Sequence, residues 1–192
     1  MRKQLQRQSS LLIALGANMQ SEVGPPEATL RHALDAMPQA GLAIRAESPF
    51  YATPCFPAGA GPDYVNAAVR VTARMDAPSV LALLHDIEQQ YGRERAVRWG
   101  QRTLDLDLIA FDDLILPDHE THTRWRQMTA ADQQVNAPQQ LILPHPRVQD
   151  RAFVLVPLKD VAPQWQHPVL GLKIDEMIEA LPTSAVSEVK PL

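Results

Sequence analysis

The sequence predicts an α+β fold in which helices pack against a mainly antiparallel sheet. Along its 192 residues, short apolar runs of strand length alternate with amphipathic patterns of helical period. The links near Thr53 and Asp112 join strand patterns without an intervening helix. Parallel neighbours need a long crossover, so these links favour antiparallel or mixed pairing. We expect one domain over 1–192, which includes a polar N-terminal tail at 1–10.

The first half of the chain supplies most of the expected elements. Pro25-Pro26 opens a helix that ends at Pro38, because proline suits a first turn. Asp76 caps a second helix, and Gly92 stands where a helix-ending glycine belongs. The expected strands are apolar or alternating runs, at 11–15, 42–51, 64–72 and 104–111.

The second half is harder to divide into elements. Residues 93–102 form a basic loop, and 117–140 is polar without periodicity, which predicts a long mobile insertion. Short apolar runs predict strands at 141–143 and 153–158, and a final helix is expected over 174–181.

Charge and composition exclude several function classes. The net charge is −4, which disfavours general binding of nucleic acid or of an anionic membrane. No apolar run approaches the ~20 residues that a membrane helix needs. Cys55 is the one cysteine, so no intrachain disulfide is possible. We expect a monomeric cytoplasmic protein that binds small molecules.

The strongest chemical signal is a pair of aspartates on an expected strand. Side chains alternate faces along a strand, so Asp105 and Asp107 share one face while Leu104, Leu106 and Leu108 share the other. Neighbouring carboxylates repel each other, and a divalent cation removes that cost. Magnesium accepts such oxygens together with water and substrate phosphates. Taken alone, the pair also suits an exposed edge strand.

A cluster of arginines leads directly into the aspartate pair. Arg93, Arg95, Arg98 and Arg102 lie within ten residues, with Trp99 among them. Guanidinium groups match phosphate oxygens, and an indole can stack on a purine or on an arginine plane. Arginines beside paired carboxylates are what phosphoryl transfer requires.

Histidines give weaker signals. His145 stands between two prolines and can donate to a phosphate oxygen, with Arg151 adding charge nearby. His119 and His122 have metal-ligand spacing, but they lie in the polar insertion and are expected on the surface. No P-loop or Rossmann glycine motif occurs.

With these residues in view, the chain resembles the 6-hydroxymethyl-7,8-dihydropterin pyrophosphokinase family of folate synthesis. The resemblance covers about residues 11–165. Its matching blocks run in the family's order: ALGAN at 14–18, SPFYATP at 48–54, PDYVNA at 62–67, IE at 87–88, GRER at 92–95, RWGQRTLDLD at 98–107, LPHP at 143–146 and RAFVL at 151–155.

The resemblance implies a fold, a reaction and a set of site residues. The fold would be ferredoxin-like, with an antiparallel sheet between helical layers. The β,γ-pyrophosphoryl group of ATP would move to the pterin hydroxymethyl oxygen, leaving AMP, with two magnesium ions bridged by Asp105 and Asp107. Arg93 and Arg102 match catalytic positions. ATP would contact Leu81, Glu88, Arg95, Arg98, Trp99, His145 and Arg151. The pterin would contact Thr53, Pro54, Tyr64, Asn66 and Phe153.

Three features depart from the family pattern or leave another function open. Cys55 replaces a common second proline, and 117–140 looks like an insertion that could be a lid or a partner contact. The D-x-D pair alone also suits a metal-dependent nucleotidyl- or glycosyltransferase. A ferredoxin-like RNA-binding module or an inactive homologue are further alternatives, though the metal and arginine positions are all kept.

Overall fold

The sheet has six strands, and every pairing in it is antiparallel. The structure is a computed structural model that describes residues 7–55, 61–91, 103–129, 132 and 136–192. The strand order is β5-β1-β4-β3-β6, and β2 also pairs with β4. The strands are β1 (Ser9–Ala17), β2 (Ala43–Glu47), β3 (Tyr51–Thr53), β4 (Tyr64–Ala73), β5 (Asp105–Phe111) and β6 (Lys190–Pro191).

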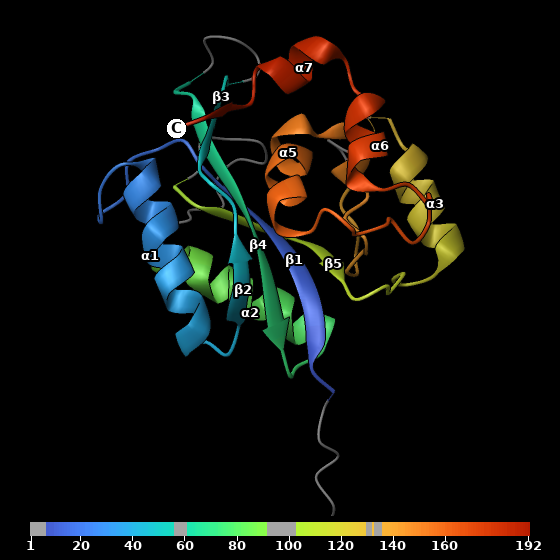
Figure 1. The fold of residues 1–192 in the computed structure, drawn as a ribbon. Coiled ribbons are helices and arrows are strands. Elements are labelled where there is room, and N and C mark those ends of the chain that lie inside the picture. Colours follow the sequence, from blue (N-terminus) through green and yellow to red (C-terminus); the bar gives the residue numbers. More distant parts are fainter. Residues whose placement is uncertain (1–6, 56–60, 92–102, 130–131, 133–135) are drawn as a thin grey trace, which may run out of the picture.

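Helices cover both faces of the sheet, so the predicted α/β/α layering is confirmed (Figure 1). One face packs against α1 (Pro26–Gln39) and α2 (Ala77–Gln90), and the other against α5 (Ala152–Val161) and α6 (Ile174–Glu179). The remaining helical segments are α3 (His119–Gln127), α7 (Thr183–Ser187) and a 3₁₀ turn, η1 (Val148–Asp150).

The alternation of side chains along β1 divides the core into two clusters. Leu11, Ile13 and Leu15 are at most 2% exposed and pack with α1 and α2. Leu12 and Ala14 point the opposite way, toward α5 and α6. A central strand buried on both faces explains why its sequence is a continuous apolar run rather than an alternating one.

Strand register aligns three residues across the sheet. Gly16 lies opposite Asn66 of β4 and opposite Asp105 of β5. Directly opposed residues share a face, so Asn66, Gly16 and Asp105 form a row over roughly 10 Å. Ala14 and Asp107 form the adjacent row on that face. The row begins at Asn66, which the resemblance assigns to the pterin, and ends at Asp105, one of the two aspartates.

The starts of both predicted helices in the first half are confirmed. Pro25 precedes α1, with Pro26 in its first turn. The Asp76 side chain accepts a hydrogen bond of 2.9 Å from the Ser79 backbone N–H, which caps α2. Pro38 does not end α1, which continues through it to Gln39. Gly92 lies outside the described residues.

Two predicted strands are wrong in type or extent. Residues 153–158 belong to α5, whose buried residues recur at helical spacing; a short apolar run does not distinguish the two structures. The strand predicted over 42–51 is split into β2 and β3, because Pro49 lacks the N–H that a ladder needs. The sheet also begins earlier than expected, at Ser9.

The segment 117–140 is not a featureless loop, because it contains α3. The Asp118 carboxylate accepts hydrogen bonds from the Thr121 backbone N–H and hydroxyl, at 2.8 and 2.9 Å, and caps the helix. Residues 141–143 form no strand: Leu143 makes an isolated antiparallel bridge with Leu116. The last predicted helix ends at Glu179, two residues early. No described helix is long and apolar enough to cross a bilayer.

A buried phenol links β3 to α5. The Tyr51 hydroxyl donates a 2.7 Å hydrogen bond to Asp160, and burial together with this carboxylate raises the pKa of Tyr51 to about 12.

We expect Tyr51→Phe to cost about 1–3 kcal/mol of unfolding free energy, measured by urea denaturation. The neutral phenol is favoured only in the folded state, so this contribution is present below pH 10 and falls as the pH rises through about 12. A wild-type protein no more sensitive to that rise than Tyr51→Phe would contradict the assignment.

Candidate active site

The aspartate pair lies where the strand pattern predicts. Asp105 and Asp107 are half-buried on β5, while Leu106 and Leu108 between and after them are buried on the opposite face. Because β5 is an edge strand, both carboxylates stand at the margin of the sheet beside the start of α5. Their shared face is therefore confirmed.

The residues present fit magnesium. Among the described residues, no three or more His, Cys, Asp or Glu side chains are grouped to hold a metal. Two carboxylates are nonetheless what magnesium commonly takes from a protein when waters and substrate phosphates complete its shell. The donor set matches a magnesium–polyphosphate complex better than a metal held by protein alone.

A buried glutamate fixes the backbone between the two aspartates. Glu88 of α2 is 0% exposed, and its Oε1 accepts a 2.8 Å hydrogen bond from the Leu106 backbone N–H. An edge strand otherwise leaves such groups without a ladder partner. Glu88 therefore positions the backbone of β5 from the side of the sheet that α2 covers. The resemblance implies that Glu88 lies near the nucleotide.

His145 and Arg151 lie beside the carboxylates. The Arg151 guanidinium is 3.5 Å from the Asp107 carboxylate. His145 is half-buried; its backbone N–H bonds to Ile109, and its Nδ1 accepts from the Arg147 N–H at 3.1 Å. Burial, then the charge of Arg151, lowers the pKa of His145 to about 3. The imidazole is therefore neutral, with its proton on Nε2 and available for donation.

A cavity of about 410 Å³ joins these groups to an apolar wall. Its lining includes the polar side chains of Asp107, His145 and Arg151. It also includes Leu81 from α2, one of the residues predicted to contact ATP, and apolar residues of β5 and of the segment before Pro144. A lining that combines charged and apolar side chains suits a nucleotide, whose phosphates and base differ in the same way.

A second group of predicted residues lies on the other side of Gly16. The Asn66 side chain is 5% exposed and donates a 2.7 Å hydrogen bond to the Thr53 hydroxyl. Tyr64 is paired with Thr53 across β3 and β4 and shares its face. A β-carbon at Gly16 would lie 3.2 Å from the Asn66 amide oxygen. Glycine at this position therefore avoids a close contact with the Asn66 amide.

The other predicted pterin residues are more exposed. Pro54 lies at the surface after β3, and Phe153 is 40% exposed in the first turn of α5. The Arg151 guanidinium lies 5.8 Å from the Phe153 ring centroid, which links this ring to the carboxylate side. The Cys55 backbone N–H bonds to the Asp63 carboxylate at 3.2 Å. The described residues on either side of 56–60 are thus joined by a side-chain contact.

The predicted basic loop lies outside the described residues. This applies to both arginines predicted to be catalytic, Arg93 and Arg102, and to three residues predicted to bind the nucleotide, namely Arg95, Arg98 and Trp99. The described residues that flank the loop, Tyr91 and Thr103, end α2 and precede β5. The loop thus connects to the strand that carries the aspartate pair.

Two residues of α3 near the site were missed by the sequence analysis. His122, expected on the surface, is 0% exposed, and its Nε2 donates a 3.0 Å hydrogen bond to the Pro144 carbonyl. Trp125 lines the cavity described above. The signal that could have found them is the pattern Asp118 to Thr121, a capped helix start.

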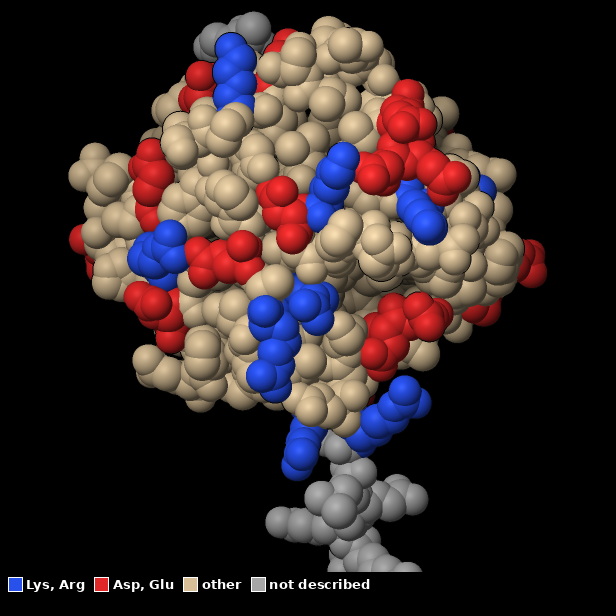
Figure 2. Space-filling model, viewed as in Figure 1, with Lys and Arg blue, Asp and Glu red and all other residues tan. Residues whose placement is uncertain are grey.

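Surface charge is mixed on the face that Figure 2 draws. Lysine and arginine side chains are interspersed there with aspartate and glutamate. RNA-binding domains gather basic residues on one face, because the phosphate backbone dominates their affinity. The described part of the face that Figure 2 draws carries no such single-sign field.

Comparison with known proteins agrees with this geometry. Residues 12–163 match the family model described as 7,8-dihydro-6-hydroxymethylpterin-pyrophosphokinase (HPPK). A 2-amino-4-hydroxy-6-hydroxymethyldihydropteridine pyrophosphokinase of Synechocystis is 35% identical over 94% of this chain and 80% of its own length. The enzyme of the same name from Pseudomonas aeruginosa is 32% identical over 91% and 93% of the two chains.

Solved structures agree on the fold. The Plasmodium falciparum HPPK-DHPS protein superposes with a TM-score of 0.63 at 15% identity, over 92% of this chain and 45% of that one. The chain thus spans about half of that longer protein. At 15% identity, this likeness shows the fold alone. The family model and the relatives at 32% and 35% identity show the family. This chain belongs to the 7,8-dihydro-6-hydroxymethylpterin-pyrophosphokinase family.

Proposed function

We propose that this chain transfers the β,γ-pyrophosphoryl group of ATP to the hydroxymethyl oxygen of 6-hydroxymethyl-7,8-dihydropterin, leaving AMP, as a step of folate synthesis. The observation that carries the proposal is the row from Asn66 through Gly16 to Asp105. It sets a buried amide on one side of a carboxylate pair whose other side opens into the nucleotide-sized cavity. The relatives named above are pyrophosphokinases.

In this proposal Asp105 and Asp107 would hold two magnesium ions that bind the phosphates of ATP. Bound magnesium would neutralise the polyphosphate and stabilise charge on the attacking and leaving oxygens. His145 donates from Nε2 to a phosphate oxygen, which its neutral state permits. Arg151, 3.5 Å from Asp107, is placed to exchange that weak contact for a phosphate.

The arginines of the basic loop complete the proposed machinery. Arg93 and Arg102 would stabilise charge on the transferring group, and Arg95, Arg98 and Trp99 would close over ATP. These roles are carried over from the matching motif. Their test is kinetic: Arg93→Ala should slow single-turnover transfer more than it weakens pterin binding, because a group that acts in the transition state leaves ground-state affinity intact.

The proposed pterin pocket gives a sharper structural prediction. Thr53, Tyr64 and Asn66 form its described part, with Pro54 and Phe153 at its rim. Gly16→Ala would place a methyl group 3.2 Å from the Asn66 amide oxygen and shift that amide. We expect the KM for the pterin to rise about tenfold while the KM for ATP changes less than twofold, since losing one good hydrogen bond is worth about 1.4 kcal/mol.

The control for this variant is Gly171→Ala, at a glycine with no atom within 4 Å of an added β-carbon and away from the row. Its positive φ of 67° makes it a test of backbone strain without any pocket contact. Equal changes in both KM values for Gly16→Ala, or a pterin KM like that of the wild type, would refute the pocket assignment.

The alternative with the same residues is a nucleotidyltransferase that uses the D-x-D pair. Such an enzyme would release pyrophosphate and attach AMP to its acceptor. Chromatography of the nucleotide products separates the two: the proposal requires AMP as the free nucleotide. Free pyrophosphate with a nucleotidylated acceptor would establish the alternative instead.

We also infer that the enzyme acts as a cytoplasmic monomer. The proposed reaction consumes ATP. The single cysteine, Cys55, supports no intrachain disulfide. Light scattering at assay concentration tests the oligomeric state, where a mass of about two chains would contradict it.

A further inference from the structure

The insertion helix α3 reaches the nucleotide cavity. Trp125 is half-buried and lines the same cavity as Asp107, His145 and Arg151. None of the motif positions that match the family falls within α3. The helix therefore adds to this site a large aromatic side chain whose position no motif specifies.

Hydrogen bonds hold α3 and its flanking residues against the segment that carries His145. His122, one turn before Trp125, is 0% exposed and donates from Nε2 to the carbonyl of Pro144 at 3.0 Å. Pro144 directly precedes His145. The backbone N–H groups of Leu116 and Leu143 also bond to each other's carbonyls, at 2.9 and 3.2 Å, and close the insertion at its base. Trp125 is thus fixed relative to the phosphate end of the cavity.

The lining of the cavity combines two kinds of side chain. Asp107, His145 and Arg151 lie close together, where a polyphosphate and its cation would lie. Leu81, Leu108 and Ile142 add aliphatic groups to the lining, and Trp125 adds an aromatic ring. An aromatic ring beside aliphatic side chains, next to a phosphate-binding end, suits a planar heterocyclic base.

We propose that Trp125 contacts the nucleobase of ATP, so that α3 forms part of the nucleotide site of this enzyme. The inference rests on the proposed function for the identity of the nucleotide. Stacking on an indole acts on the base alone, whereas His145, Arg151 and the carboxylate pair act on the phosphates. The two contributions are therefore separable by ligands that lack a base.

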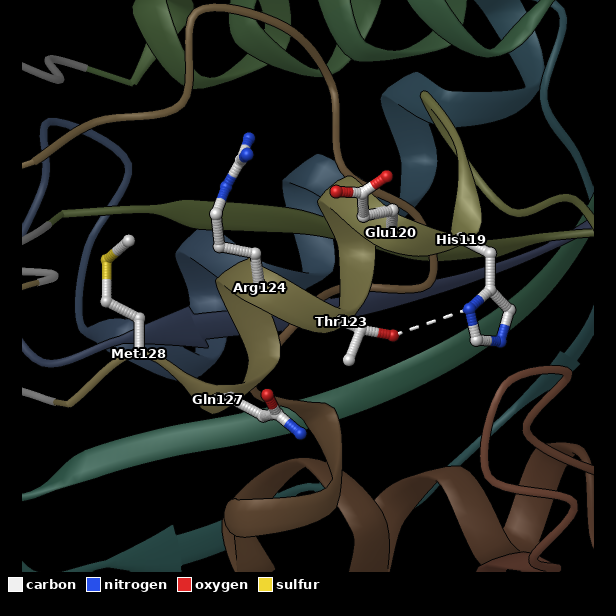
Figure 3. Close-up of a pocket in the computed structure, with 6 residues that line it drawn as sticks. All are labelled: His119, Glu120, Thr123, Arg124, Gln127 and Met128. Carbon is white, nitrogen blue, oxygen red and sulfur yellow. Dashed lines mark hydrogen bonds between the residues drawn. The ribbon is translucent and has the colours of Figure 1, made fainter.

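The opposite face of α3 offers a matched control. Arg124 and Gln127 are exposed and line a separate open pocket with His119 and Met128, all from α3 or its end (Figure 3). Successive helical residues are 100° apart, so Gln127 points about 160° away from Trp125. Gln127→Ala changes the same helix without touching the nucleotide cavity.

The test is a binding titration by calorimetry on the full chain with magnesium. The ligands are α,β-methylene-ATP, in which the bond to be broken is inert, and inorganic tripolyphosphate, which has no base. The proteins are the wild type, Trp125→Ala, Trp125→Phe and Gln127→Ala. Circular dichroism and urea denaturation check that each variant is folded.

We expect Trp125→Ala to weaken binding of α,β-methylene-ATP by about tenfold or more, the range seen when a base-stacking ring is removed. Binding of tripolyphosphate should change less than twofold. Trp125→Phe, which keeps an aromatic face, should retain most of the nucleotide affinity, and Gln127→Ala should match the wild type.

Three results would overturn the inference. Unchanged nucleotide affinity in Trp125→Ala would show that the indole makes no base contact. An equal loss for nucleotide and tripolyphosphate would show that Trp125 only supports the position of α3. A wild type that binds neither ligand would refute the proposed function itself, and the inference with it. If Trp125→Ala does not fold, Trp125→Leu replaces it, because leucine keeps an apolar side chain but has no aromatic face. Unchanged nucleotide affinity in Trp125→Leu, or an equal loss for nucleotide and tripolyphosphate, would then overturn the inference.

Discussion

Asp105→Ala and Asp107→Ala are each expected to lower kcat about a thousandfold while leaving the protein folded. In the proposed mechanism each carboxylate would hold part of the magnesium charge that stabilises the transition state, and losing it is worth about 4 kcal/mol. Both side chains are half-buried at an edge strand and repel each other, so their removal does not open the core. Steady-state kinetics at saturating magnesium, beside urea denaturation, measures both quantities.

Asp113→Ala provides the control for this pair. Asp113 is an exposed carboxylate in the turn directly after β5, so its removal changes net charge equally without touching the site. We expect it to keep the activity of the wild type. If Asp105→Ala or Asp107→Ala also kept near-normal activity, the metal assignment would be wrong.

Glu88→Ala is expected to lower the unfolding free energy by about 2–4 kcal/mol and to reduce kcat as well. The substitution leaves the buried Leu106 N–H without its acceptor and removes packed carbon from under the strand. Because Leu106 lies between the two aspartates, a looser backbone there also spreads their positions. Urea denaturation and kcat are the two measurements.

Glu88→Gln separates this positioning role from a direct role in nucleotide binding. Glutamine keeps an oxygen that accepts from the Leu106 N–H, so stability and kcat should stay near those of the wild type. A Glu88→Gln variant with native stability but a strongly raised KM for ATP would instead favour the nucleotide contact implied by the resemblance.

The aspartate pair could be predicted because strand alternation is a local property. The pattern Leu104 to Leu108 fixes which side chains share a face wherever the strand lies in the sheet. The row of Asn66, Gly16 and Asp105 could not, because it depends on which strands pair and in which register. That information lies in contacts between distant segments.

The helices α5 and α3 could not be predicted from the sequence, for different physical reasons. The run at 153–158 is apolar at nearly every position, so its periodicity does not distinguish helix from strand, and burial between β4 and α6 decides. In α3 the buried face carries His122 instead of aliphatic residues, so no apolar stripe marks it. The helix is fixed by its Asp118 cap and by the hydrogen bond to Pro144.

The most direct test of the central claim follows the phosphorus atoms. ATP labelled with ³²P at the β-position is incubated with magnesium and 6-hydroxymethyl-7,8-dihydropterin, and the products are separated. We expect the label to enter a pterin diphosphate, with one AMP formed for each pterin diphosphate. This should happen only when pterin and magnesium are both present. Label found in free pyrophosphate or in ADP, with none on the pterin, would contradict it.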